Sequence, residues 1–176
     1  MVIIAGLGNP EDKYTNTRHN VGFEAIDTIA QHFSFPVFKE KSACNALISE
    51  GRIDGIKTVL IKPSTYMNES GVAVKATMRN FKDQEMKLIV IHDDIDIPLG
   101  EVKIGENRGS AGHNGVRSVI QRLGNQDFTR IRIGILPTEG KPSDVENFVL
   151  QKFSKEEAQT IAELLVGLPS SIQHLI

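Results

Sequence analysis

Residues Met1–Pro10, MVIIAGLGNP, carry the clearest evidence for the fold. Val2–Leu7 is a continuous apolar run, and the glycines and proline of GLGNP end it. A short apolar run bounded by turn residues is typical of a strand that is buried on both faces. Such a strand must be covered by helices on each side of its sheet, so the run predicts an α/β fold.

Outward from this strand, the chain alternates between helical and β-prone patterns. Apolar residues at helical spacing predict amphipathic helices, and short apolar or alternating runs predict strands. Asp54-Gly55 lies between two β-prone runs, which is a strong hairpin signal. Ser154 and Glu157 have the spacing of a capping box at the start of the last helix. The expected helices span 22–33, 69–81, 116–123 and 154–166, and the expected strands span 2–7, 45–53, 56–61, 88–91, 102–104 and 128–135.

These elements predict a single domain over residues 1–176, an α/β fold with a twisted mixed β-sheet flanked by helices on both faces. The single cysteine, Cys44, excludes an internal disulfide framework and a multi-cysteine zinc site, and it suits a cytoplasmic protein. No apolar run reaches the ~18 residues of a membrane span, and no basic region precedes the first apolar stretch. We therefore expect neither a membrane partner nor a secretory signal.

The charge of the chain becomes informative only when it is resolved along the sequence. The formal net charge is −2, from 20 basic and 22 acidic residues, which is not that of a general nucleic-acid binder. Between Glu101 and Arg132, however, bases outnumber acids, a pattern that suits a surface holding RNA or a nucleotide. Taken alone, a solvated helix face explains this segment better. Its bases are Lys103, Arg108, Arg117, Arg122, Arg130 and Arg132.

The first loops contribute an amide and a histidine rather than a phosphate-binding turn. A dinucleotide fingerprint needs a third glycine where Glu11 stands, and a Walker loop needs Gly-Lys-Ser/Thr. What remains is Asn9, a neutral amide between glycines and a proline. Further along, Thr17–Gly22 (TRHNVG) places His19 in polar surroundings ahead of a helix, in the kind of loop where α/β folds build sites. Asn20 is expected to be the N-cap of that helix.

The segment HDDIDIPLG, residues 92–100, leaves a buried strand and presents Asp93, Asp94 and Asp96. Three acids within four residues could bind a hard cation such as Mg²⁺. They could instead supply one carboxylate that orients a histidine, with the others in solvent. No cage of histidine or cysteine ligands is nearby in the sequence, so the second interpretation is favoured.

Two further loops carry polar residues to helix starts. Pro63–Gly71 (PSTYMNESG) offers Asn68, for which the role of a helix N-cap is the better local interpretation. Gly109–Gly115 (GSAGHNG) carries His113 and Asn114 to a helix start, where backbone N–H groups attract phosphate or carboxylate. The alternative for the second loop is a glycine-rich turn with Asn114 as its cap.

Together these loops match one family. The motifs are GLGNP, Y-x-x-T-R-H-N-x-G, Y-M-N-x-S-G, H-D-D-x-D-x-P-x-G, G-H-N-G and F-x-R-x-R-I-G-I, in this order. On these motifs the sequence resembles the bacterial peptidyl-tRNA hydrolases over roughly residues 1–150. It departs from the family at Glu11 and Ala111, where glycine is common. We also expect the tail 167–176 (GLPSSIQHLI) to lack the family's usual longer C-terminal helix.

The resemblance implies hydrolysis of the ester that joins a peptide to the ribose of the 3′ adenosine of tRNA. By matching position, His19 is the catalytic histidine and Asp93 is the carboxylate that supports it. The family's properties further imply a cytoplasmic monomer that acts on the acceptor end of peptidyl-tRNA, without a cofactor or a metal. The positions that match substrate-binding residues are Asn9, Asn68 and Asn114 as positioning amides, Tyr14, Tyr66, Met67 and His113 as further contacts, and Lys103 and Arg132 toward tRNA.

The chemistry of these residue types suits the implied reaction. Histidine, with an ordinary pKa near 6.5, is the natural base to deprotonate water at neutral pH. A carboxylate on its far nitrogen fixes the tautomer, and neutral asparagine amides can stabilise the charge that develops on the carbonyl oxygen. G-x-S-x-G is absent and Cys44 has no paired base in the sequence, so direct attack by water is favoured over an acyl-enzyme.

Two other classes of protein stay open at this point. One is a non-catalytic RNA-binding relative of the same fold. The other is a metal-dependent peptidase or a nucleotide-binding α/β enzyme, which would use GLGNP and the acids at 93–96.

Overall fold

β1 (Val2–Gly6) lies in the middle of the sheet, and all five of its residues are buried. In the computed structural model, which describes residues 1–81 and 85–176, β1 pairs in parallel with β4 (Ile56–Pro63) on one side and β5 (Lys87–Pro98) on the other. The described strands form one seven-stranded mixed sheet in the order β2-β3-β4-β1-β5-β7-β6. The expected α/β fold with a mixed sheet is confirmed.

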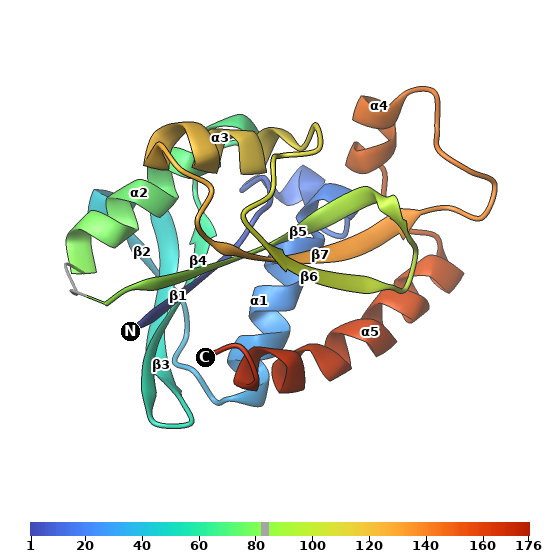
Figure 1. The fold of residues 1–176 in the computed structure, drawn as a ribbon. Helices are drawn as coiled ribbons and strands as arrows, with labels where there is room; N and C mark the ends of the chain where they lie inside the picture. The colour runs from blue at the N-terminus through green and yellow to red at the C-terminus, as the bar shows by residue number, and fades with distance from the viewer. Residues whose placement is uncertain (82–84) are drawn as a thin grey trace.

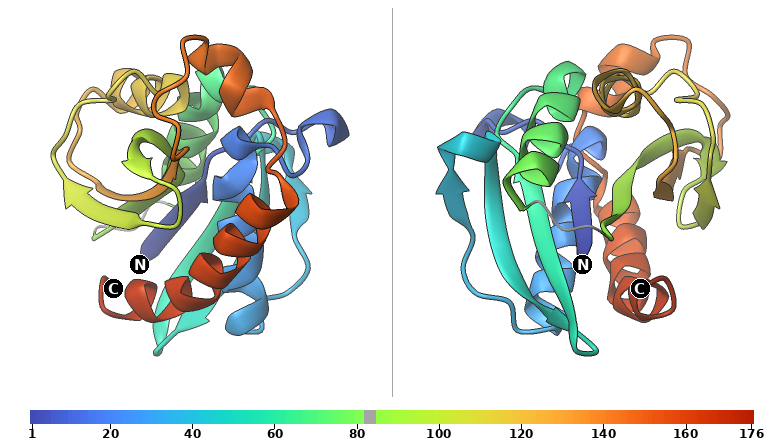
Figure 2. Two further views of the ribbon diagram at one scale, coloured as in Figure 1. Left: turned by 90° about the vertical axis from the view of Figure 1, so that its right-hand side faces the viewer. Right: turned by 60° about the vertical axis from the view of Figure 1, so that its left-hand side comes forward.

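Helices cover both faces of the sheet. Figure 1 shows α1 and α5 on one face and α2 and α3 on the other, with α4 standing apart from both layers. Each pair of helices buries its own apolar cluster against the sheet. The two turned views show the same layers, and in both of them the two chain ends lie side by side (Figure 2). No helix in the described ranges is long and apolar enough to cross a membrane.

The remaining elements follow the expected order, with bounds shifted by a few residues. The Asp54-Gly55 hairpin joins two antiparallel strands as predicted, and both turn residues have positive φ. The strands are β2 (Lys39–Lys41), β3 (Ala46–Ile53), β6 (Val102–Glu106) and β7 (Thr129–Leu136). The helices are α1 (Val21–His32), α2 (Ser70–Phe81), α3 (Asn114–Leu123), α4 (Val145–Leu150) and α5 (Lys155–Gln173), with short 3-10 turns η1 (Asp12–Tyr14), η2 (Arg18–Asn20), η3 (Ser42–Cys44) and η4 (Met67–Glu69).

Two elements have no counterpart among those predicted. β2 consists of three charged residues and pairs only with β3, so it is an edge strand without an apolar pattern. α4 has six residues, of which only Val149 is buried. Neither carries the periodic apolar signal on which the prediction of elements depends.

β5 is longer than expected, and this places the acids differently. The predicted strand ends at 91, but β5 continues through His92 and Asp93 to Pro98, with a register irregularity between Asp94 and Pro98. β7 runs alongside and supplies backbone partners, so pairing continues where the apolar run has ended. The segment 92–98 therefore belongs to the sheet, although the sequence suggested that it leaves the strand.

The last helix also extends beyond its predicted end at 166, into the tail that was expected to lack a longer helix. α5 begins with the predicted capping box at Ser154 and Glu157, but it continues past Pro169 to Gln173. Leu165, Leu168 and Ile172 are buried in the cluster beneath α1 and α5, and this apolar contact holds the helix together across the proline.

The end of β1 and the start of α1 approach so closely that only glycine fits at the contact. A Cβ on Gly6 would lie 2.2 Å from the carbonyl oxygen of Gly22, and a Cβ on Gly22 would lie 2.5 Å from that of Leu7. This contact holds the loop that carries Asn9 against the turn that carries His19.

Candidate active site

The site is centred on Asp93, a carboxylate on β5 that is only 2% exposed. Its two oxygens lie 2.9 and 3.0 Å from Nδ1 of His19, which stands on η2 immediately before α1. The two residues are 74 positions apart in the sequence. The parallel pairing of β1 and β5 brings their carboxyl ends to the same edge of the sheet, and the two side chains meet there.

The contact with Asp93 fixes the tautomer of His19. Nδ1 must carry the proton that the carboxylate accepts, so Nε2 is left with a free lone pair. Burial, the largest effect, lowers the pKa of His19, but the charge and hydrogen bond of Asp93 outweigh it, and the pKa lies above its ordinary value. For Asp93 the largest effect is again burial, which raises the pKa of the carboxyl group. His19 and His113 together outweigh burial and hold this pKa well below its usual range. The pair is therefore a carboxylate and an imidazole that is poised to accept a proton.

His113 holds the same carboxylate from the opposite layer. Its Nε2 lies 2.9 Å from Oδ1 of Asp93, and its Nδ1 accepts hydrogen bonds from the backbone N–H groups of Gly115 and Val116. His113 is therefore the N-cap of α3. The sequence-based alternative, with Asn114 as the cap, is wrong because the His113 imidazole, and not the Asn114 amide, accepts the hydrogen bonds from these N–H groups.

Asn9 is held by its backbone and by one side of its amide. Its N–H donates to Oδ1 of Asn20, and Nδ2 of Asn20 donates back to the Asn9 carbonyl, both at 2.9 Å. Oδ1 of Asn9 accepts from the Met67 N–H at 2.8 Å, which leaves its Nδ2 group as a donor for the cleft. Asn20 is at the N-cap position of α1 but makes no side-chain cap, because Asn9 occupies its amide instead.

The two other amides also reach the cleft. Asn114, the first residue of α3, accepts a hydrogen bond on Oδ1 from Arg117 at 2.7 Å, so its Nδ2 group is likewise turned outward. Asn68 is exposed on η4, where it makes no side-chain cap. A cleft of about 680 Å³ joins all of these groups. The sequence-predicted residues that line it are Asn9, Tyr14, His19, Met67, Asn68, Asp93, His113 and Asn114.

Three predicted residues lie outside this lining. The hydroxyl of Tyr66 donates to Glu11 on the exposed surface. Lys103 on β6 is exposed and stands opposite Arg132 on β7. Nε of Arg132 donates to Asp94 at 2.8 Å, so this guanidinium is partly engaged within the protein.

The neighbouring acids do not gather around a common point. Asp94 pairs with Arg132, Asp96 pairs with Lys141 at 2.6 Å, and Asp93 faces the two histidines. The Mg²⁺ interpretation of these three acids is therefore wrong, because each carboxylate turns toward a different basic partner.

The far wall of the cleft was not predicted from the sequence. Lys141 and α4 form this wall, and α4 was not predicted because its apolar pattern is weak. Arg18, next to His19, connects the turn that carries His19 to this region, since its buried guanidinium stacks on Phe148 at 4.1 Å and pairs with Glu157 at 2.7 Å. Its position in the motif beside His19 was the one available signal.

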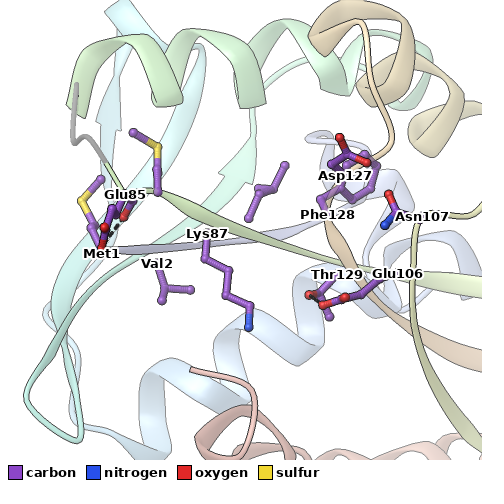
Figure 3. A pocket seen from close by; sticks show the side chains of 11 residues that line it. Met1, Val2, Glu85, Lys87, Glu106, Asn107, Asp127, Phe128 and Thr129 are labelled. Carbon is purple, nitrogen blue, oxygen red and sulfur yellow. Dashed lines mark hydrogen bonds between the residues drawn. The ribbon is translucent and has the colours of Figure 1, made fainter.

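A second cavity, of about 550 Å³, lies at the other end of the sheet (Figure 3). Several of its polar groups are bound within the protein. The Met1 ammonium donates to the Glu85 carbonyl oxygen, and the Thr129 hydroxyl donates to Glu106 at 2.8 Å. None of the predicted site residues lines this cavity.

In sequence and in overall structure, the chain is similar to one family of known proteins. The family model described as peptidyl-tRNA hydrolase matches residues 3–176. The peptidyl-tRNA hydrolase of Thermodesulfovibrio yellowstonii is 45% identical over 100% of this chain and 92% of its own length, and that of Shouchella clausii is 46% identical over 89% and 83%. A mutant of the peptidyl-tRNA hydrolase of Acinetobacter baumannii, 28% identical, superimposes with a TM-score of 0.89 over 98% of this chain and 87% of that one. The chain belongs to the peptidyl-tRNA hydrolase family.

Proposed function

We propose that this chain hydrolyses the ester between peptide and tRNA in peptidyl-tRNA, with His19 as the general base. The observation that carries the proposal is the His19–Asp93 contact at the edge of the cleft, with Nε2 of His19 free to accept a proton. Membership of the family supplies the substrate, since the relatives are named for this activity.

In the proposed reaction, Nε2 of His19 takes a proton from a water molecule as that water attacks the ester carbonyl carbon. Asp93 stabilises the imidazolium that forms, and the proton then passes to the leaving ribose oxygen. The Nδ2 groups of Asn9 and Asn114 supply donors for the carbonyl oxygen as it becomes negative. Cys44 is fully buried in the cluster beneath α2 and α3, which favours water over a thiolate nucleophile.

We further propose that the reaction needs no metal. His19, Asp93 and His113 are the one group of suitable ligands that converges within the described residues. However, a metal on Nε2 of His113 would leave the ring proton on Nδ1, pointing at the two N–H groups of α3. This would replace two hydrogen bonds by donor–donor contacts, so the proton on Nε2 suits the site better than a metal.

The basic residues of β6 and β7 are proposed to contact tRNA. Lys103 is exposed beside Arg132, so both can face a phosphate backbone outside the cleft. We also propose that residues 1–176 act as one domain and as a monomer, in the cytoplasm where translation takes place.

The test is hydrolysis of N-acetyl-aminoacyl-tRNA by the wild type and by His19→Ala, in parallel and again after treatment with excess EDTA. We expect turnover by the wild type with or without EDTA, and a loss of about 10³–10⁴ in kcat for the variant. Circular dichroism and binding of uncharged tRNA should be unchanged in the variant. Turnover near the wild-type rate by His19→Ala would refute the assignment. Absence of turnover by the wild type, with tRNA still bound, would favour the non-catalytic RNA-binding class.

A further inference from the structure

Asp93 is shared by two imidazoles, and only one of them is free to act as a base. Oδ1 of Asp93 lies 2.9 Å from Nδ1 of His19 and 2.9 Å from Nε2 of His113. The two rings are neighbours, with centroids 4.9 Å apart. A carboxylate held from two sides distributes its charge between two partners, so what His113 does to Asp93 must also affect His19.

The start of α3 locks the protonation state of His113. Its Nδ1 accepts from the N–H groups of Gly115 at 3.1 Å and Val116 at 3.3 Å, so this nitrogen carries a lone pair and Nε2 carries the proton. A second proton on Nδ1 would break both contacts and would place a positive charge at the positive end of the helix dipole. His113 is therefore a neutral donor to Asp93, and it cannot take the role of the base.

Donation by His113 weakens the hold of Asp93 on the positively charged form of His19. A hydrogen bond to a carboxylate stabilises and partly neutralises its charge. A carboxylate with one donor fewer would attract the His19 imidazolium more strongly. A general base works best when it is unprotonated at the working pH, so excessive stabilisation of the imidazolium would slow the reaction near neutral pH.

We propose that His113 is a positioning residue that acts through Asp93: it limits how strongly Asp93 stabilises protonated His19 and so keeps the catalytic imidazole in its base form near neutral pH. This role deepens the proposed function and rests on it, because it takes His19 as the base. It also gives His113 a purpose different from the direct substrate contact that the family resemblance implies.

Within the described residues, only His19 and His113 bond to the Asp93 carboxylate, and the other charged and titratable groups around it do not. His92, on β5, is 1% exposed, and burial is the largest of the effects that hold its pKa well below the ordinary value. Its Nδ1 donates to the backbone carbonyl of Asp93, and its ring packs edge-on against His113 at 4.6 Å. The remaining groups are Arg18 of η2 with Glu157, Asp94 of β5 with Arg132 of β7, Arg130 of β7, Asp96 of β5 with Lys141, Arg117 of α3 with Asn114, and Glu146 of α4.

The variant that tests the proposal is His113→Asn. Asparagine is among the best N-cap residues, so its oxygen keeps the start of α3 satisfied. Its shorter amide cannot cap the helix and also reach Asp93, so the donation to Asp93 is lost while the cap is kept. His32→Asn is the matched control, since His32 is an exposed histidine on α1, outside the cleft.

The measurement is an NMR titration of the histidine ring nitrogens in the substrate-free protein, followed by the pH dependence of kcat/KM. We expect the titration midpoint of His19 to rise in His113→Asn, by less than the ~1 pH unit that corresponds to a whole hydrogen bond to a charged group, because Asp93 is a carboxylate in both protonation states of His19. The acid limb of kcat/KM should move in the same direction. The wild type and His32→Asn should agree.

An unchanged or lowered His19 midpoint in His113→Asn would overturn the proposal. So would a rise in His113→Ala that His113→Asn does not share, because the helix cap rather than the donation would then be responsible. The titration needs no substrate. A wild type without turnover would therefore reject the proposed function, while the effect of His113 on His19 would still be read directly.

Discussion

The two ends of the sheet carry cavities of similar size, about 680 Å³ at the carboxyl ends of the central strands and about 550 Å³ at the amino end. At the amino end, the Met1 ammonium and the Thr129 hydroxyl are bound within the protein. At the carboxyl end, fixed hydrogen bonds orient Asn9 and His19 so that a donor and a lone pair remain for a ligand. The volume of a cavity therefore does not identify a functional site. A functional site is identified by polar side chains that the protein holds through one atom and that leave another atom free for a ligand.

Among the variants that test this difference between the two cavities, Asp93→Asn is expected to have the largest effect on kcat. The variant should lose about 10²–10⁴ in kcat, since an amide does not stabilise the imidazolium that forms on His19. The pH profile should change as well. In the wild type the pKa of His19 lies above its ordinary value of 6.5. Activity should therefore rise as the pH passes through the pKa of His19 and the imidazole loses its proton. Without Asp93 only the lowering by burial remains, so the midpoint should move to lower pH while the plateau falls.

The matched control is Lys87→Met in the amino-end cavity, where Nζ of the lysine donates to the Leu175 carbonyl oxygen. Its kcat and pH profile should equal those of the wild type. A pH midpoint that stays in place in Asp93→Asn would contradict the electrostatic link between Asp93 and His19. A large loss of kcat in Lys87→Met would remove the contrast between the two cavities.

The same carboxylate makes stability depend on pH. The pKa of Asp93 is depressed in the folded state, so its charged form contributes stability that is present above the unfolded value near 3.8. That contribution should disappear as the pH falls through the folded value. The raised pKa of His19 has the opposite sign, since its contribution is present below about pH 6.5 and is lost as the pH rises through the folded value.

A smaller effect is expected for Asn9→Ala, which removes one donor from the cleft. Loss of a single donor to a developing oxyanion costs about 10²–10³ in kcat, and KM should change little because the donor acts mainly in the transition state. Asn80→Ala, at an exposed position on α2, is the matched control and should keep wild-type kcat. If Asn9→Ala instead raised KM at constant kcat, Asn9 would bind the substrate without stabilising the transition state.

The contrast between the two ends also shows what the sequence could predict. Val2–Leu7 predicted the central strand because a continuous apolar run is a local signal. His19, Asn9 and Asp93 could be singled out because they are polar residues at strand ends, and the family motifs paired two of them. Their distances could not be predicted, because the 74 residues between His19 and Asp93 are brought together by sheet pairing.

The roles of other site residues depended on contacts that no local pattern contains. Asn20 has the type and position of an N-cap, yet its amide holds Asn9, because the close approach of Gly6 to Gly22 brings that loop within reach. His113 caps α3 although histidine is not a common cap, since the same ring also serves Asp93. In each case tertiary contacts decided between two local possibilities.

The smallest expected effect tests the surface beyond the cleft, where Lys103→Ala removes an exposed charge from β6. If Lys103 neutralises a tRNA phosphate, KM should rise by about two- to fivefold at low salt, and the deficit should shrink as salt increases, since one counterion contact is lost. Lys39→Ala, an exposed lysine on the opposite edge strand β2, should not change KM. A deficit that is independent of salt would argue against a phosphate contact. Arg132 is a poorer probe than Lys103 because it also pairs with the buried Asp94, so its removal would mix tRNA affinity with stability.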